Sequence, residues 1–321
     1  MNNLKQFANS LGFISVILFI DTRILVESVE TPEGMVWIEG GSFLMGSDQG
    51  LLDERPAHRV KLSGFWIDEH EVTNTDFAKF ISETRYETYS EKVKDSLVFE
   101  SPNQEASFSL PALSWWKLVP NANWRKPEGG RDSIEGKENH PVVHVTYQDA
   151  QQYCHWLDKE LPTEAQFEYA ARGGYEGEIY SWGSQPRHRH EVLINYWQGS
   201  FPYNNEIHDG YASSAPVGSF PPNNYGLYDI TGNVWEWVSD WYHPNYYSNS
   251  PLRNPKGVTE AESFDPNEPA LPKRSIRGGS FLCSENYCSG FRVSARMPAE
   301  PSSSTNHTGF RCVANKVGWF H

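Results

Sequence analysis

The chain has 321 residues and a formal net charge of −14, and 38% of its residues are hydrophobic while 21% are charged. This composition is typical of a folded domain and excludes a disordered chain. The excess of acidic residues argues against nucleic acid as a partner, because phosphate binding relies on clustered Lys and Arg. Abundant Trp, Tyr and Phe beside 25 Gly and 21 Pro indicate an irregular fold in which aromatic side chains pack between loops.

The N-terminus contains the only long apolar run, LGFISVILFI at residues 11–20. That run is too short to span a bilayer but has the length of the apolar region of a secretory signal. Small residues at 26–28 supply a cleavage site. We therefore predict that residues 1–28 are a signal peptide and that the protein is exported to a secretory lumen or periplasm. An uncleaved membrane anchor and a cytoplasmic protein are the alternatives.

Secondary-structure signals follow along the chain. Alternating apolar residues predict strands within residues 35–47 and at 58–62 and 64–68. Good N-cap residues predict helices that begin at Thr73 or Asn74, at Thr146 and at Thr163. Residues 91–136 are expected to be mostly irregular, and after Tyr175 the chain is expected to form loops and short strands. No break in composition separates two domains, so we predict a single α+β domain with little regular structure.

Two of the four cysteines, Cys283 and Cys288, lie in a polar, glycine-rich loop between Arg277 and Arg292. Nearby positive charge lowers a cysteine pKa, and two thiolates this close can form a reversible disulfide or bind a soft ion such as Cu(I). The alternative is a structural disulfide or two small buried hydrophobic residues, and the loop by itself slightly favours that alternative.

The other two cysteines have apolar surroundings. Cys154 lies on a predicted helix in line with Tyr147, Ala150 and Leu157, and Cys312 lies in the segment GFRCV. We expect both to be core residues, and a bond between them stays open. Residues 187–190, which alternate Arg and His, are interpreted as a solvated loop because the flanking positive charge disfavours a metal.

Two segments are rich in Asn, Asp and Gly, at residues 195–211 and 229–236. Calcium binds six to eight oxygens, which such loops supply from side chains and carbonyls. The same residue types also form ordinary turns, and spacing alone favours that explanation.

Several blocks, in order along residues 35–313, resemble the formylglycine-generating enzyme family, whose members activate sulfatases. The blocks are MVWIEGGSFLMG at 35–46, WW at 115–116, ANWR at 122–125, HPVVH at 140–144, LPTEAQFEY at 161–169, PPNNYGLY at 221–228, GNVWEW at 232–237, RGGS at 277–280 and GFRC at 309–312. The ANWR block and the cysteine pair are the most specific. The resemblance implies a domain over residues 33–316 with a fold akin to C-type lectins.

The resemblance implies a copper-dependent oxidase. Cys283 and Cys288 match the two cysteines that hold one Cu(I) ion in the family. The substrate is the cysteine of a Cys-X-Pro-X-Arg motif in an unfolded sulfatase, which dioxygen converts to formylglycine while an external thiol supplies electrons. A monomeric chain is expected. The alternatives are a catalytically silent paralogue that binds sulfatases or other peptides, and another enzyme of the same superfamily.

Other site residues are carried over from the family by position. Ser280 and Tyr287 match residues that line the oxygen pocket, and Trp235 matches a wall of that pocket. Arg292 matches a further active-site residue, and His307 occupies a position in the peptide groove.

The resemblance also implies two structural Ca²⁺ sites. The first would use the side chains of Asn195 and Asp209 and the carbonyls of Tyr196 and Tyr211. The second would use the side chains of Asp229 and Glu236 and the carbonyls of Thr231, Gly232 and Val234.

The chain departs from the family at several positions. Ser284, Ser289 and Gly290 replace basic or bulkier residues near the cysteines, which puts the peptide preference in question. Ala171 and Val293 stand where secreted animal members have cysteines, and the resemblance therefore implies that Cys312 lacks a disulfide partner.

Overall fold

The computed structural model describes residues 32–102, 114–130, 132–184 and 192–315. The predicted signal segment 1–28 and the loop at 187–190 lie outside these residues. Within the described ranges, no helix combines the length and the apolar character needed to cross a bilayer.

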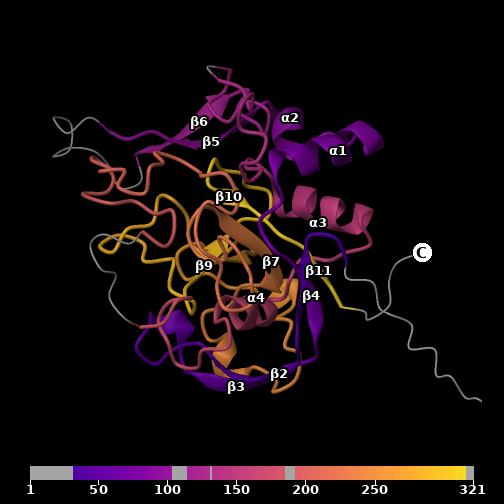
Figure 1. The fold of residues 1–321 in the computed structure, drawn as a ribbon, viewed down its shortest axis with the longest axis vertical. Helices are drawn as coiled ribbons and strands as arrows, with labels where there is room; N and C mark the ends of the chain where they lie inside the picture. Colours follow the sequence, from indigo (N-terminus) through magenta and orange to yellow (C-terminus); the bar gives the residue numbers. More distant parts are fainter. Residues whose placement is uncertain (1–31, 103–113, 131, 185–191, 316–321) are drawn as a thin grey trace, which may run out of the picture.

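Two small sheets and two hairpins make up the β structure, and loops connect them (Figure 1). The four-stranded sheet has the order β10-β7-β8-β9, and the three-stranded sheet has the order β1-β4-β11. The strands of the four-stranded sheet are β10 (Thr308–Gly309), β7 (Trp235–Trp241), β8 (Arg274–Arg277) and β9 (Arg296–Ala299), and those of the three-stranded sheet are β1 (Met35–Ile38), β4 (Phe65–Asp68) and β11 (Val313–Ala314).

The hairpins are β2 (Gly41–Met45) with β3 (His58–Leu62), and β5 (Asp95–Phe99) with β6 (Trp116–Pro120). The first pair and β1 and β4 lie where the sequence predicts strands. Residues 91–136 are mostly irregular, as predicted, but they also contain this second pair of strands, which the sequence did not indicate. Its two strands are far apart in the chain, and each is stabilised by backbone bonds to the other that no local pattern reveals.

Four α-helices begin at threonine caps. The helices are α1 (Asn74–Thr84), α2 (Tyr89–Val93), α3 (Tyr147–Trp156) and α4 (Glu164–Ala171), and short 3₁₀ turns occur at η1 (Leu52–Glu54), η3 (Tyr246–Asn249) and η4 (Glu260–Glu262). At every α-helix, the cap hydroxyl accepts the N3 amide while the N3 side chain bonds back to the cap. The predicted starts of α1, α3 and α4 are confirmed.

Helix α4 lies beside the four-stranded sheet (Figure 1), and a buried ion-pair network attaches the two. Arg277, the last residue of β8, contacts Glu164 at 3.0 Å and Glu168 at 2.7 Å. Arg296 on β9 also pairs with Glu164, at 2.7 Å. These side chains are almost wholly buried, and removing one partner would leave an uncompensated charge in the core. The network therefore fixes the point from which the cysteine loop leaves β8.

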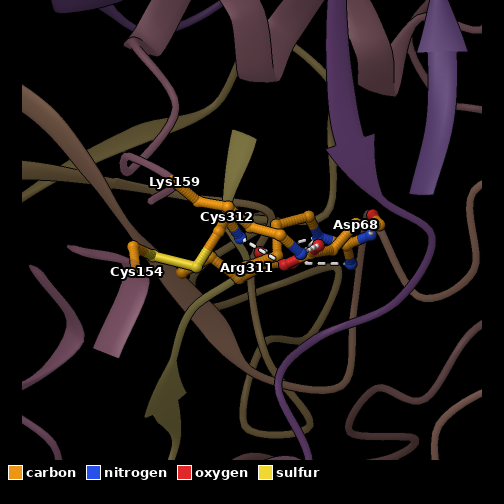
Figure 2. Close-up of a disulfide and its surroundings, with 6 residues drawn as sticks. Asp68, Cys154, Lys159, Arg311 and Cys312 are labelled. Atoms are coloured by element: carbon orange, nitrogen blue, oxygen red, sulfur yellow. Dashed lines mark hydrogen bonds and ion pairs between the residues drawn. A yellow bond between two sulfur atoms is a disulfide. The ribbon is translucent and has the colours of Figure 1, made fainter. Parts of the chain in front are cut away.

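Cys154 on α3 forms a disulfide with Cys312, with a Cα–Cα distance of 5.7 Å (Figure 2). Both cysteines are fully buried, as predicted. The expectation that Cys312 lacks a partner is wrong. After α3, Glu160 exchanges two backbone hydrogen bonds with Val313, at 2.8 and 2.7 Å, and this pairing brings the end of the helix beside Cys312.

Candidate active site and metal sites

The loop at residues 277–292 follows the C-terminal end of β8. It begins with two glycines that have positive φ, Gly278 at +93° and Gly279 at +78°. A Cβ atom at Gly279 would lie 2.6 Å from the backbone of Gly290. Only glycine allows both the backbone conformation and this close approach. The two ends of the loop therefore lie against each other, and the cysteines are held between them.

Cys283 and Cys288 are joined as a disulfide in the structure. Cys283 is only 1% exposed, whereas Cys288 is half-buried. The amide of Cys283 donates to the carbonyl of Ser280 at 2.9 Å, and its own carbonyl accepts the amide of Trp197 at 2.9 Å. Cys283 thus lies in the interior while Cys288 is partly accessible, and accessible disulfides are the more readily reduced ones.

Trp235, the first residue of β7, lies against the buried cysteine. A Cβ atom at Gly290 would come within 2.5 Å of the Trp235 ring and 2.9 Å of the Cys283 sulfur. The ring, the sulfur and the backbone of Gly290 are therefore in close contact. Because Trp235 is 2% exposed, its indole shields one side of Cys283 from water. Glycine at position 290 is therefore explained by the close packing of Trp235 and Cys283, independently of its effect on peptide preference.

Ser280 and His307 meet behind the cysteine loop. The Ser280 hydroxyl oxygen lies 3.0 Å from His307 Nδ1, and it also accepts the amide of Leu282 at 3.3 Å. The ring of Trp116 covers His307, with ring centroids 4.8 Å apart. His307 is only 8% exposed. The sequence places this residue in an open peptide groove, and the structure places most of it in contact with Ser280 and Trp116.

Tyr287 is the exposed aromatic side chain of the loop, with 46% of its surface accessible. Its ring stacks on Phe201 with centroids 4.1 Å apart and meets Trp115 edge-on at 6.0 Å. Partial burial raises the pKa of Tyr287, so its hydroxyl is protonated at neutral pH. Together these rings form a rigid aromatic surface next to Cys288.

Arg292 is held by a carboxylate rather than left as a free cation. Two of its nitrogens donate to the two oxygens of Glu54, each at 2.6 Å, and Ser294 donates to the same carboxylate at 2.7 Å. Burial acts to raise the pKa of Glu54, but the hydrogen bonds and charge of Arg292 lower it overall. The pair attaches η1 to the end of the cysteine loop. A direct role of Arg292 in the active site stays a prediction.

At the first predicted calcium site, Asp209 and the Tyr196 carbonyl meet at the side chain of Gln198. Among the described residues, the buried Asn195 Oδ1 has no hydrogen-bond partner, while Asp209 accepts the backbone amides of Tyr196 and Tyr211 at 3.1 and 3.0 Å. The side-chain amide nitrogen of Gln198, Nε2, donates to the Tyr196 carbonyl at 2.5 Å and to the Asp209 carboxylate at 2.6 Å. The oxygen donors suit Ca²⁺, and the unpaired Asn195 oxygen is the atom that a cation would satisfy.

The second predicted site fits in part. Asp229 accepts the amide of Gly218 at 2.7 Å with one oxygen, and its other oxygen is buried without a partner. Glu236 already forms a two-nitrogen pair with Arg311, with contacts from 2.8 to 3.1 Å. Gly232 has a φ of +90°, and a Cβ there would lie 2.6 Å from the Asn195 carbonyl, so the two calcium segments touch. Thr231 and Val234 are buried in the same segment.

Sequence reasoning missed Glu71, which follows β4. Its side chain is fully buried, and within the part of the chain that the structure describes neither carboxylate oxygen has a hydrogen-bond partner. Burial and the charge of Asp229 raise the pKa of Glu71, and burial raises the pKa of Asp229 to about 6. Nothing local distinguishes Glu71 from Asp68 and Glu69, because only the tertiary fold buries it. Across the described ranges no three His, Cys, Asp or Glu side chains form a metal cage, so a cation here would also need carbonyl ligands.

Comparison with known proteins places these observations in one family. A family model described as the sulfatase-modifying factor enzyme 1-like domain matches residues 23–316. The formylglycine-generating enzyme of Mus musculus is 43% identical over 291 residues, covering 88% of this chain and 75% of the mouse protein. The formylglycine-generating enzyme of Streptomyces coelicolor is 44% identical over 291 residues, covering 88% and 90%.

Among solved structures, PvdO from Pseudomonas aeruginosa matches with a TM-score of 0.63 and 25% identity, covering 87% of this chain and 93% of that one. This match confirms the predicted fold class. An inactive C-alpha-formylglycine-generating enzyme 2 of Mus musculus is also 40% identical over 304 residues, covering 91% and 89%. Identity alone therefore does not separate active from inactive relatives.

Proposed function

The chain belongs to the sulfatase-modifying factor family, and we propose that it is an oxidase that converts a cysteine of an unfolded sulfatase into formylglycine. The observation that carries the proposal is the pair Cys283 and Cys288, the first buried and the second partly exposed. Trp235 packs near the Cys283 sulfur, the Ser280 carbonyl accepts the amide of Cys283, and the exposed Tyr287 directly precedes Cys288. This set offers two soft ligands, a hydroxyl and a dry aromatic wall.

The proposed cofactor is Cu(I), held by Cys283 and Cys288 once their disulfide is reduced. Two thiolates are the ligands that this soft ion prefers. When bound, Cu(I) would supply the centre at which dioxygen and the substrate thiolate meet. The residues of the chain have simpler tasks: Trp235 excludes water from the buried sulfur, and Ser280 offers a hydroxyl that can hydrogen-bond reduced oxygen.

The overall reaction balances with an external thiol as co-substrate. The peptide cysteine and dioxygen react with two reducing thiols to give the aldehyde, hydrogen sulfide, water and one disulfide. Dioxygen accepts four electrons, two from the peptide cysteine and two from the thiols, and all protons are accounted for in the sulfide and the water. The proposal thus requires a reductant as well as oxygen.

The proposed substrate is an unfolded segment with the motif Cys-X-Pro-X-Arg. The net charge of −14 favours a peptide that carries arginine. The aromatic surface of Tyr287, Phe201 and Trp115 offers a rigid contact for an extended chain. We further propose that the chain acts as a monomer in an exported compartment, with the disulfide Cys154–Cys312 suited to oxidising surroundings.

Calcium is proposed as a structural ion. Asn195 and Asp229 each have a buried oxygen without a partner, and Glu71 has two. We add Glu71 to the second predicted site, since its charge lies near those of Asp229 and Glu236. A bound divalent cation would neutralise carboxylates whose burial otherwise costs free energy, and it would stabilise only the folded state.

The alternative is a catalytically silent paralogue that binds sulfatases. The 40% identity to the inactive mouse relative is the reason to consider it. Retention of both cysteines favours the oxidase. The decisive experiment incubates the reduced, copper-loaded protein with a Cys-X-Pro-X-Arg peptide, a thiol and oxygen, and follows the peptide by mass spectrometry and an aldehyde probe.

We expect conversion of the peptide cysteine to an aldehyde by the wild type. Cys283→Ser and Cys288→Ser should each abolish conversion, and Ser289→Ala serves as a neighbouring control that should not. A folded wild type that binds copper and peptide without forming aldehyde would show that the silent paralogue is correct.

A further inference from the structure

We propose that His307 is the positioning residue of the Ser280 hydroxyl, and that it affects the oxidation through Ser280 rather than by holding the peptide. This inference rests on the proposed function. It reassigns a residue that sequence similarity places in the substrate groove.

The backbone and the ring of His307 are both fixed. Its carbonyl accepts the amide of Trp235 at 2.8 Å, and the next residue, Thr308, pairs with Trp235 in the β10–β7 ladder. Trp116 covers the ring, with centroids 4.8 Å apart. Since the side chain is only 8% exposed, most of it is out of reach of a peptide. Tyr287, by comparison, is 46% exposed and is the better candidate for peptide contact.

Ser280 connects the histidine to the buried cysteine. Its hydroxyl oxygen lies 3.0 Å from His307 Nδ1, and its carbonyl accepts the amide of Cys283 at 2.9 Å. Ser280 and Cys283 therefore belong to one turn, and the rotamer of Ser280 decides where its hydroxyl lies relative to that turn. Within the described residues, the hydroxyl has two further groups to bond: the Leu282 amide and the His307 ring.

The ring supplies a hydrogen bond without supplying a charge. Burial, reinforced by His144, lowers the pKa of His307 to about 3, so the imidazole is neutral over the physiological range. In either tautomer Nδ1 can bond the hydroxyl, as acceptor or as donor. The histidine thus restricts the rotamer of Ser280. Because its imidazole is neutral, it places no positive charge next to the cysteine loop.

The kinetic test uses two substitutions that separate positioning from peptide binding. His307→Asn keeps an amide atom near the place of Nδ1 and should retain kcat within a few-fold. His307→Leu removes the bond and should lower kcat roughly 10- to 100-fold, the cost typical of losing a supporting partner, with KM unchanged. In the background of Ser280→Ala, His307→Leu should cause little further loss, because both act through one hydroxyl.

A second readout does not depend on turnover. In protein labelled with ¹⁵N-histidine, Ser280→Ala should shift the Nδ1 resonance of His307 while the far-ultraviolet circular dichroism stays the same. An unchanged resonance would overturn the inference.

The inference would also fail if His307→Leu raised KM with kcat unchanged, or if its effect multiplied that of Ser280→Ala. Those outcomes would return His307 to the peptide groove. Absence of turnover in the wild type would sink the proposed function and this inference with it. Wild-type turnover with an unchanged kcat in His307→Leu would sink the inference alone.

Discussion

The two disulfides of this chain have the same chemistry and opposite surroundings. The structural disulfide, Cys154–Cys312, joins residues 158 apart in the sequence, and both sulfurs are buried. The active-site pair, Cys283 and Cys288, joins residues five apart, and one of them is near solvent.

Both cysteines of the structural disulfide belong to the hydrophobic core, and charged side chains lie beside the backbone of Cys312 (Figure 2). The amide of Cys312 donates to Asp68 at 2.8 Å, Asp68 pairs with Lys159 at 2.6 Å, and Arg311 pairs with Glu236. The neighbours of Cys283 that we identify, including Ser280, Trp235 and Gly290, carry no charge.

The difference indicates what each bond is for. A link across a long stretch of chain removes much freedom from the unfolded state, whereas a link across five residues removes little. The short link therefore contributes less stability, and its accessible sulfur lets it open and close during a reaction. The following experiments test this division of roles.

The largest expected effect is on stability. Replacing Cys154 and Cys312 together by Ser should lower the free energy of unfolding by about 5 kcal/mol, and replacing Cys283 and Cys288 together should lower it by only about 2 kcal/mol. Urea unfolding measures both, and peptide turnover at low temperature should survive only in the first variant. Equal losses of stability would contradict the assigned roles.

Gly290→Ala sharpens the description of the active-site pair. The added methyl group would meet the Trp235 ring at 2.5 Å and the Cys283 sulfur at 2.9 Å. We expect turnover to fall and the free energy of unfolding to drop by about 1–3 kcal/mol, as for other overpacked sites. Ser289→Ala is the matched control and should change neither. Full activity in Gly290→Ala would mean that the contact between ring and sulfur is not needed.

Glu71→Gln tests the charged region near the structural disulfide. With excess Ca²⁺ the variant should lose roughly 1–3 kcal/mol of stability, because a ligand charge is gone. In a chelator the sign should reverse, since the variant then removes a buried and unpaired carboxylate. The exposed Glu83→Gln is the control. The measurement is the melting temperature of variant and wild type, with and without Ca²⁺. A change in melting temperature of the same sign in both conditions would argue against a cation at Glu71.

A further effect is expected in the pH dependence. Asp229 has a pKa of about 6 in the folded chain, raised by burial from its ordinary value. The folded state thus binds the proton more tightly than the unfolded state. Without Ca²⁺, this residue should lower stability as the pH rises from about 4 to about 6, by up to about 3 kcal/mol, and cost no more above that range.

In the Asp229→Asn variant, the free energy of unfolding should not show this decrease between about pH 4 and pH 6. Saturating Ca²⁺ should abolish the same decrease in the wild type. Urea unfolding at several pH values provides the measurement. Parallel curves for variant and wild type in chelator would show that Asp229 does not titrate in this range.

Local sequence features predicted much of the framework. Thr73, Thr146 and Thr163 mark helix starts because a cap is a local interaction between a hydroxyl and an amide three residues on. The cysteine pair is likewise evident from its spacing. Other features depend on contacts between distant segments: the pairing of β5 with β6, the bond between Cys154 and Cys312, and the pair of Arg292 with Glu54. Glu71 has no local signal at all, because burial alone makes it unusual.

The most direct test of the central claim measures labelling and turnover in the same sample. The folded protein is reduced with a mild thiol and alkylated for increasing times, and peptide mapping then reports which cysteines have reacted. We predict that Cys288, the accessible member of the pair, is labelled first, that peptide conversion falls in proportion to its labelling, and that Cys154–Cys312 stays intact until the protein unfolds. Turnover that survives full labelling of Cys288 would contradict the assignment of this pair as the reactive centre.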